Sequence, residues 1–295
     1  MYLKAFSDYL QFEKQVSSHT ITAYLRDMDD FRVYIRDEFD MGVEDLSYAM
    51  IRNWIVFLTE SGISARSINR KISSLRSYYR FLMKIGRLEK SPLAQHNALK
   101  AAKKVQIPFS KKEVNAVMDL LESEEEDFGS VRNRLIMELL YSTGMRRSEL
   151  IGLEVKDLGF SNRSIRIRGK GNKERIVPLL PSVVSRAEEY LRYRGRLPEI
   201  VDEDFLLLTE KGKALYPNLV YRLVHGYFDL VSEKVKKSPH LLRHSFATHL
   251  INEGANINAV KELLGHSGLA STQVYAENSI ARLKEVYENS HPRSR

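Results

Sequence analysis

The sequence predicts a mainly α-helical protein of two domains, with a small β-sheet in the second. Three observations lead to this prediction. Apolar residues recur at helical spacing through the first 85 residues, a polar stretch bounded by prolines interrupts the pattern, and alternating segments around residue 170 predict a hairpin. A chain of 295 residues is long enough for about two domains, each with its own core.

The first domain is predicted to be a compact bundle. Its helices are expected over residues 2–13, 20–39, 48–61 and 65–85. Ser18 and Ser47 stand where helix N-caps are expected, and Gly62 and Gly86 stand where helices end. In the fourth helix an apolar stripe is expected to be buried: Ile68, Ile72, Leu75, Tyr79 and Leu82.

Basic residues gather on the rest of that fourth helix. Arginines that can reach phosphates and base edges occupy four positions there: Arg66, Arg70, Arg76 and Arg80. Between residues 61 and 106 the only acidic residue is Glu89, although solvated helices usually mix both signs of charge. A net charge of +8 is by itself common on soluble proteins. The concentration of positive charge in this segment favours an interface for double-stranded DNA over a basic face that is merely solvated.

The domain boundaries follow from composition. We expect a helical DNA-binding domain over residues 1–93, a basic linker over 94–107 and a second domain over 108–295. The chain has no cysteine, which excludes disulfides and thiolate metal sites and fits a reducing compartment. Its first residues lack a signal-peptide core, and no apolar run has membrane-spanning length. A cytoplasmic protein with no membrane partner is expected.

The second domain is predicted to contain a hairpin between several helices. The hairpin strands are expected over residues 164–168 and 174–177, and a further short strand over 205–209. Helices are expected over residues 110–121, 131–142, 181–194, 218–235, 258–264 and 269–277, with a last short helix within 280–295. The acidic run at 122–127 is expected to be a solvated turn that faces away from DNA.

A candidate phosphate site lies at the start of a helix near residue 239. Ser238 can cap this helix and Pro239 suits its first position. His240 and Arg243 are three residues apart in the first turn, where free backbone N–H groups favour anions. His240 and His244 have the spacing of a zinc-protease helix, but the required glutamate after the first histidine is absent. A structural histidine is the alternative interpretation of His240.

Two more basic positions favour an anion. Arg146 and Arg147 follow a glycine at the start of a helix, where the helix dipole disfavours cations, and Glu149 is placed to orient Arg146. Lys170 stands at the hairpin tip between glycines, although the sequence lacks the end of a P-loop motif. Tyr275 lies in a short amphipathic segment, and its spacing alone indicates ordinary packing.

Together these motifs resemble a known family. They read Thr-Gly-Met-Arg at 143–146, Gly-Lys-Gly-Asn-Lys-Glu-Arg at 169–175, His-Leu-Leu-Arg-His at 240–244 and Leu-Gly-His-Ser at 264–267, followed by Tyr275. In this order they resemble the boxes of tyrosine site-specific recombinases of the phage-integrase family, and within it the Xer type. The resemblance covers nearly the whole chain.

The resemblance implies a role for each of these residues. Tyr275 would be the nucleophile, Arg146 and Arg243 would hold the scissile phosphate, and Lys170 would protonate the leaving 5′ oxygen. His240 and His266 would assist proton transfer and contact the phosphate. Glu149 would be a partner of the Thr-Gly-Met-Arg motif without touching the DNA itself. Arg147 stands where a small or apolar residue is expected, and we assign the inward role to Arg146.

The chemistry of these residue types agrees with the implied roles. Arginine forks can bind the non-bridging oxygens of a phosphodiester in a bidentate way, so two arginines can replace a metal. A tyrosine with a pKa of about 10 becomes nucleophilic where cations favour its phenolate. Attack by tyrosine exchanges one phosphodiester for another, so neither ATP, a metal nor any other cofactor is expected.

The resemblance also implies an assembly. A SAM-like core-binding domain and a catalytic domain would form a C-shaped clamp around DNA. Four protomers, identical or shared with a paralogous recombinase, would act on two sites, with the C-terminal helix docked on a neighbouring subunit. The implied function is resolution of chromosome dimers for chromosome partition at cell division, and a DNA translocase is a further partner to consider. Three alternatives stay open: an integrase or transposase of a mobile element, a type IB topoisomerase-like enzyme, and a non-enzymatic DNA-binding protein.

Overall fold

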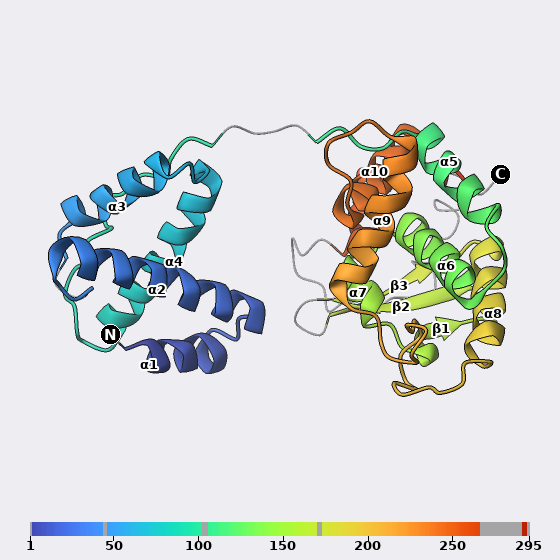
Figure 1. The fold of residues 1–295 in the computed structure, drawn as a ribbon, viewed down its shortest axis with the longest axis horizontal. Coiled ribbons are helices and arrows are strands. Elements are labelled where there is room, and N and C mark those ends of the chain that lie inside the picture. Colours follow the sequence, from blue (N-terminus) through green and yellow to red (C-terminus); the bar gives the residue numbers. More distant parts are fainter. Residues whose placement is uncertain (1, 44–45, 102–105, 170–172, 266–290, 294–295) are drawn as a thin grey trace. The chain divides into compact units, whose positions relative to one another are not determined.

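The computed structural model describes all residues except 1, 44–45, 102–105, 170–172, 266–290 and 294–295. The chain divides into two compact units, Met1–Val105 and Gln106–Arg295. Both are built mainly of helices, and a three-stranded sheet lies in the second unit (Figure 1). The predicted fold class, mainly α with a small sheet, is therefore confirmed. Within the described part of the chain, the helices are too short or too polar to cross a lipid bilayer.

The helical elements of the N-terminal unit are α1 (Leu3–Asp8), η1 (Tyr9–Glu13), α2 (Ser18–Phe39), α3 (Tyr48–Glu60) and α4 (Ala65–Lys84). The four predicted helices are confirmed, but the first changes into a π-helix at Tyr9. Large aromatic side chains fill the core between the helices, among them Phe6, Phe31 and Trp54. Ser17, one residue before the expected cap, caps α2 by accepting a hydrogen bond from the backbone N–H of Thr20.

A buried carboxylate joins α2 to α4. The predicted apolar stripe of α4 is buried, and Asp27 of α2 is fully buried beside it. Asp27 accepts a hydrogen bond from the Ser74 hydroxyl at 2.7 Å and forms ion pairs with Arg70 and, at 3.4 Å, with Lys71. A buried charge is tolerated only when it is paired in this way. The crossing of the two helices therefore depends on polar as well as apolar contacts.

The segment that follows α4 packs on that helix. Asn69 exchanges two hydrogen bonds with the backbone of Leu99, at 2.8 and 2.9 Å. Arg76 donates a hydrogen bond to the carbonyl of His96 at 2.5 Å, and Leu93 is part of the core. Much of the stretch expected to begin the linker thus makes specific contacts with the N-terminal unit.

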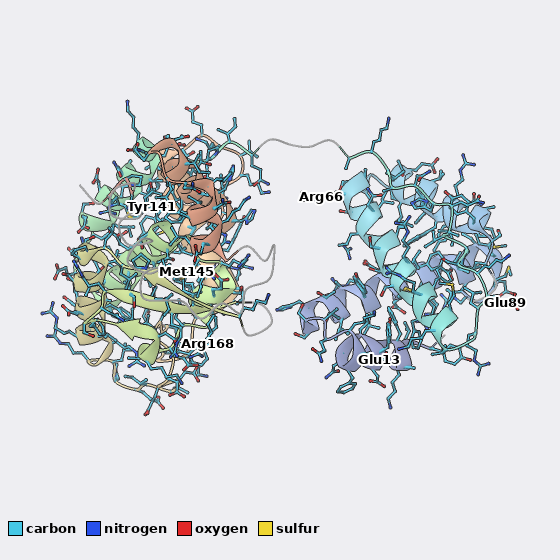
Figure 2. The ribbon with its side chains drawn as sticks, turned by 180° about the vertical axis from the view of Figure 1, so that it is seen from behind. Glu13, Arg66, Glu89, Tyr141, Met145 and Arg168 are labelled. Atoms are coloured by element: carbon cyan, nitrogen blue, oxygen red, sulfur yellow. The ribbon has the colours of Figure 1, made fainter. Side chains whose placement is uncertain are left out.

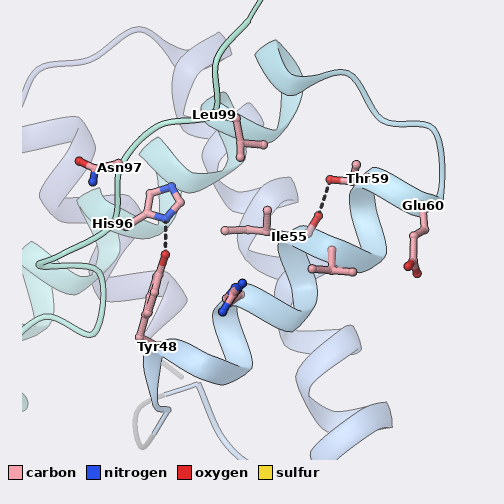
Figure 3. A pocket seen from close by; sticks show the side chains of 9 residues that line it. Tyr48, Ile55, Thr59, Glu60, His96, Asn97 and Leu99 are labelled. Atoms are coloured by element: carbon pink, nitrogen blue, oxygen red, sulfur yellow. Dashed lines mark hydrogen bonds between the residues drawn. The ribbon is translucent and has the colours of Figure 1, made fainter.

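A hollow of about 410 Å³ lies between α3 and this segment (Figure 3). Its wall includes Tyr48, whose hydroxyl lies 3.1 Å from His96 Nδ1, and the apolar side chains of Ile55 and Leu99. None of the predicted site residues that the structure describes lines this hollow. It belongs to the packing of the N-terminal unit.

The C-terminal unit surrounds one buried helix. Its elements are α5 (Lys111–Glu122), α6 (Phe128–Thr143), α7 (Arg147–Ile151), η2 (Val155–Asp157), β1 (Leu158–Gly159), β2 (Ser164–Arg168), β3 (Glu174–Pro178), α8 (Pro181–Arg194), α9 (Pro217–Val231), α10 (Pro239–Asn252) and α11 (Ile257–Leu264). α6 contacts α5, α8, α9 and α10 and is buried on almost all sides. Its strongly apolar sequence is typical of such a central helix.

The sheet has the antiparallel order β1-β2-β3 (Figure 1). The predicted hairpin is confirmed, with Ile165 paired to Val177 and Arg168 to Glu174. The predicted strand at 205–209 is wrong, because this segment forms only isolated bridges. Its three consecutive leucines are all buried, so it has no exposed face to pair as an ordinary strand. The third strand, β1, is only two residues long and too short to give an alternating pattern.

The acidic run forms the expected solvated turn between α5 and α6, since most of its residues are exposed. Several of its carboxylates nevertheless contact the surrounding helices. Glu122 pairs with Arg186, and Glu124 accepts a hydrogen bond from the Tyr227 hydroxyl at 2.7 Å. Asp127 caps α6 by accepting from the backbone N–H of Ser130 at 2.6 Å. The run therefore connects α5 and α6 to α8 and α9.

The described end of the chain packs on its own unit. His291 is 2% exposed and lies against the rings of Tyr141 and Phe246. Arg293 forms an ion pair with the buried Glu138 of α6 at 2.8 Å. The terminal helix expected to dock on a neighbouring subunit lies almost entirely outside the described residues, so that docking stays a prediction.

Gly144 ends α6 in a conformation that disfavours other residues. Its φ is +60°, and an added Cβ would lie 2.4 Å from Phe246 Cδ1. We expect Gly144→Ala to lower the free energy of unfolding of the C-terminal unit by about 2–5 kcal/mol, from the left-handed backbone and the overpacking together. Denaturant unfolding of the full chain measures this loss.

The matched control is Gly226→Ala in the middle of α9. An added Cβ there meets nothing within 4 Å, so this change should stabilise the unit by about 1 kcal/mol through helix propensity. Equal effects of the two substitutions would contradict the close approach at Gly144.

Candidate active site

The start of α10 is built as the sequence predicts. The Ser238 side chain accepts a hydrogen bond from the backbone N–H of Leu241 at 3.3 Å, and Pro239 occupies the first helical position. His240 is exposed, whereas Arg243, one turn further, is only 6% exposed. A guanidinium is rarely buried to this extent without partners.

Backbone carbonyls at two helix ends hold Arg243. Its Nη1 donates to the carbonyl of Gly144 at 2.5 Å and its Nη2 to the carbonyl of Leu264 at 2.7 Å. Both helices end in a left-handed glycine, Gly144 after α6 and Gly265 after α11. Burial and then the nearby Arg146 lower the pKa of Arg243 to about 10, so it stays fully cationic at neutral pH.

Glu149 ties Arg146 to the start of α7. Its carboxylate accepts from the Arg146 backbone N–H at 2.8 Å and from Arg146 Nη1 at 2.7 Å. The Arg146 side chain remains 45% exposed, so part of its guanidinium is open to a ligand. Arg147 instead donates to the carbonyl of Pro217 at 3.2 Å, on the side of α9. This geometry supports the choice of Arg146 over Arg147. Met145, which precedes Arg146 in the sequence and is labelled in Figure 2, is fully buried and anchors the turn.

Arg175 of β3 is a member of the cluster to which the sequence motifs assign no role. It binds Glu149 in a bidentate way, Nη1 to Oε1 at 3.1 Å and Nη2 to Oε2 at 2.8 Å, and its Nε donates to the carbonyl of Leu263 at 2.8 Å. A signal was present. Strand alternation places Arg175 on the same face as Val177, which is fully buried, and an arginine on a buried face needs an anionic partner.

The cluster carries three guanidinium groups around one carboxylate. Burial alone would raise the pKa of Glu149, but hydrogen bonds from Arg175 and Arg146 lower it below its usual value. Glu149 is therefore ionised, and its Oε2 lies 3.9 Å from Arg243 Nη1. With three positive charges and one negative charge, the cluster keeps a formal charge of +2. Such a site favours a phosphate.

His240 lies beside this cluster and is neutral at physiological pH. Desolvation of its ring, followed by the positive charges of Arg243 and Lys236, lowers the pKa of His240 below its usual value. A neutral imidazole can accept a proton or donate one. Among the described residues, no group of three or more His, Asp or Glu side chains could hold a metal ion.

Three of the predicted site residues, Lys170, His266 and Tyr275, lie outside the described residues. The described residues directly before Lys170 and His266 border the cluster. A Cβ at Gly169, before Lys170, would lie 3.6 Å from Glu149 Oε1, and a Cβ at Gly265, before His266, would lie 3.1 Å from Arg175 Cδ. The chain thus approaches the cluster directly before two of the three positions.

The four arginines predicted to contact DNA on α4 differ in their surroundings. Arg70 pairs with the buried carboxylate of α2, and Arg76 binds the backbone after α4, so both also stabilise the fold. Arg66, labelled in Figure 2 on the first turn of α4, is exposed, and in the described part of the chain its side chain forms no ion pair. Arg80 is exposed as well, and among the described residues its side chain bonds only the carbonyl of Arg76, one turn earlier.

The cluster predicts a large effect of neutralising its carboxylate. Glu149→Gln should lower the free energy of unfolding by about 3 kcal/mol, because it leaves buried guanidinium groups without a counter-charge. Denaturant unfolding at pH 7.5 measures the loss. Glu253→Gln, which breaks the exposed pair with Lys111, is the control and should change stability by less than about 1 kcal/mol. An equally small effect of both changes would contradict the counter-charge role of Glu149.

The sequence of this chain is similar to those of known protein families and of individual proteins. The phage integrase family matches residues 107–282, and the phage integrase N-terminal SAM-like domain matches residues 3–86. Tyrosine recombinase XerC of Chlorobaculum parvum is 36% identical over 316 residues, which cover 99% of this chain and 94% of the relative. Tyrosine recombinase XerC of Bacillus subtilis is 33% identical over 300 residues, covering 99% of this chain and 97% of the relative.

Solved structures share the fold. XerH site-specific recombinase in a post-cleavage complex with palindromic difH substrate matches with a TM-score of 0.73 and 23% identity, covering 97% of this chain and 83% of that chain. The Tn1549 transposon integrase in complex with transposon right end DNA matches with a TM-score of 0.72 and 22% identity, covering 96% and 98%. Together with the matches in sequence, these findings show that the chain belongs to the phage integrase family of tyrosine recombinases.

Proposed function

We propose that this chain is a site-specific recombinase that cuts and rejoins double-stranded DNA through a 3′-phosphotyrosyl intermediate. One observation carries the proposal. Arg146 and Arg243, from different helices, are gathered at a single ionised carboxylate, and the cluster retains positive charge. A phosphodiester undergoing attack gains charge on its non-bridging oxygens, and preorganised guanidinium groups stabilise that charge. Membership of the family supports the same chemistry.

The proposed roles follow the charges of the cluster. Arg146 and Arg243 bind the scissile phosphate, and their charges favour the phenolate of Tyr275, which attacks the phosphorus. Lys170 protonates the departing 5′ oxygen. The neutral His240, together with His266, exchanges protons with the reacting groups. Glu149 holds Arg146 in place.

Strand exchange follows from the chemistry of the intermediate. The phosphotyrosyl bond has about the energy of the phosphodiester it replaces, so a 5′ hydroxyl from either duplex can reverse the step without ATP. Exchange requires two duplexes held together. We therefore propose a tetramer on DNA, formed with identical subunits or with a paralogous recombinase.

We propose resolution of chromosome dimers in the cytoplasm as the biological role, with a DNA translocase as a further partner. The support is the similarity over nearly the full length to proteins named XerC. An integrase or transposase of a mobile element is the second candidate, favoured by the structural match to the Tn1549 transposon integrase. Recombination of two chromosomal sites, compared with excision of an element, separates the two roles. A topoisomerase-like enzyme would relax supercoils without recombining either substrate.

DNA contact is divided between the two units in this proposal. Residues 1–93 form the core-binding domain, residues 94–107 link it to the catalytic domain of residues 108–295, and both domains contact the same duplex. The match of residues 3–86 to the SAM-like domain supports the first assignment. The exposed arginines of α4 provide the phosphate contacts.

The assignment of the nucleophile predicts the loss of the covalent intermediate. Tyr275→Phe should form no adduct on a nicked suicide substrate, because phenylalanine has no oxygen to attack phosphorus, while DNA binding changes by less than about twofold. Denaturing electrophoresis detects the adduct. The matched control is Tyr221→Phe, because Tyr221 is exposed and its change should leave adduct formation intact. Tyr190 is unsuitable as a control because it is part of the packed core. An adduct in Tyr275→Phe would place the nucleophile elsewhere.

The charge pattern of α4 predicts weaker DNA binding without loss of stability. Arg66→Ala and Arg80→Ala should each reduce the salt dependence of binding, with the slope of log K against log salt falling by about 1. Titrations at several salt concentrations measure the slope. Arg76→Ala is the contrast, because it also releases the backbone of His96 and should lower stability. If the slopes for Arg66→Ala and Arg80→Ala equalled that of the unmodified chain, this face of α4 would not be part of the DNA interface.

A further inference from the structure

We propose that Arg175 is a positioning residue for the cleavage step. By holding both oxygens of Glu149, it prevents this carboxylate from neutralising Arg243, the guanidinium meant for the scissile phosphate. The inference rests on the proposed function and adds to it a residue that touches neither DNA nor the reacting atoms. Its role is to control which guanidinium the carboxylate binds.

The contacts of Arg175 join three separate elements. From β3 it reaches Glu149 on α7 through two hydrogen bonds and the carbonyl of Leu263 on α11 through a third. Its side chain is only 6% exposed, so these bonds are shielded from water. Gly265 leaves room for it, since a Cβ there would lie 3.1 Å from Arg175 Cδ. Arg175 therefore fixes the carboxylate against β3, the strand that follows the hairpin tip.

Arg175 and Arg243 are competing partners for the Glu149 carboxylate. Glu149 Oε2 accepts from Arg175 at 2.8 Å but lies 3.9 Å from Arg243 Nη1, beyond hydrogen-bond distance. If the Arg175 fork is removed, that oxygen loses the guanidinium that donates to it and keeps the backbone N–H of Arg146. Arg146 already binds the other carboxylate oxygen, and Arg243 is the next cation within reach in the described part of the chain. A carboxylate bound to Arg243 would compete with the phosphate for the same donors.

The balance of charge leads to the same conclusion. With Arg175 the cluster has three guanidinium groups and one carboxylate, and without it two guanidinium groups and one carboxylate. The formal charge available to a phosphate then falls from +2 to +1. Removing the carboxylate as well restores +2. A second substitution at Glu149 should therefore restore part of the cleavage rate that the loss of Arg175 removes. A defect caused only by lost packing at Arg175 would not be rescued in this way.

The experiment compares Arg175→Met, Glu149→Gln and their combination in the full chain. The rate of covalent adduct formation is measured on the nicked suicide substrate under saturating enzyme, with binding and unfolding measured in parallel. We expect Arg175→Met to slow cleavage by about 100-fold, the upper range for residues that orient a site, with binding changed by less than about twofold. The double variant should cleave about 10-fold faster than Arg175→Met.

Arg134→Met is the matched control. Arg134 is also buried in the C-terminal unit, but its side chain donates to the backbone carbonyls of Leu121 and Glu124, away from the cluster. Its loss should lower stability and leave the cleavage rate of the folded protein unchanged. If Arg134→Met slowed cleavage as much as Arg175→Met, the effect would reflect general destabilisation, and the proposal would be wrong.

Arg175→Lys replaces the methionine variant if the latter does not fold. A lysine can engage one carboxylate oxygen but not both, so cleavage should fall by about 10-fold and recover when Glu149→Gln is added. Cleavage at the wild-type rate in the single variant, or a double variant no faster than the single one, would overturn the proposal. If the wild-type chain forms no adduct at all, the proposed function fails instead.

Discussion

The structure of the site depends on one buried carboxylate among three guanidinium groups. Glu149 is almost fully buried, and the free energy cost of desolvating it is offset only because Arg146 and Arg175 bind both of its oxygens. The third guanidinium, that of Arg243, stays just outside hydrogen-bond distance of it. The guanidinium groups are thus held in fixed positions with an excess of positive charge. Such an arrangement is suited to a transition state that gains negative charge.

Helix ends provide the remaining constraint. The carbonyls of Gly144 and Leu264 belong to the ends of α6 and α11, where left-handed glycines turn the chain away. Carbonyls in the last turn of a helix have no partner within it, so they can accept from Arg243. The orientation of this guanidinium is therefore set by the fold as a whole. Close packing of Gly144 against Phe246 links that orientation to the hydrophobic core.

Much of this could be predicted from the sequence because the signals are local. Helical spacing gave the four N-terminal helices, alternation gave the hairpin, and the Ser-Pro pair gave the start of α10. The role of Arg175 was missed because its partner Glu149 is 26 residues away and no local pattern links the two. The strand expected at 205–209 failed because a run of buried leucines does not distinguish a strand from a packed loop. The contact of α4 with Asp27 likewise depends on tertiary packing.

The most direct test of the central claim is a crystal structure of the Tyr275→Phe chain bound to a duplex that contains its cleavage site. We expect non-bridging oxygens of the scissile phosphate about 2.7–3.2 Å from the guanidinium groups of both Arg146 and Arg243, with Glu149 still held by Arg175. A phosphate bound elsewhere, for example at Arg147, or a Glu149 carboxylate hydrogen-bonded to Arg243 in that complex, would contradict it.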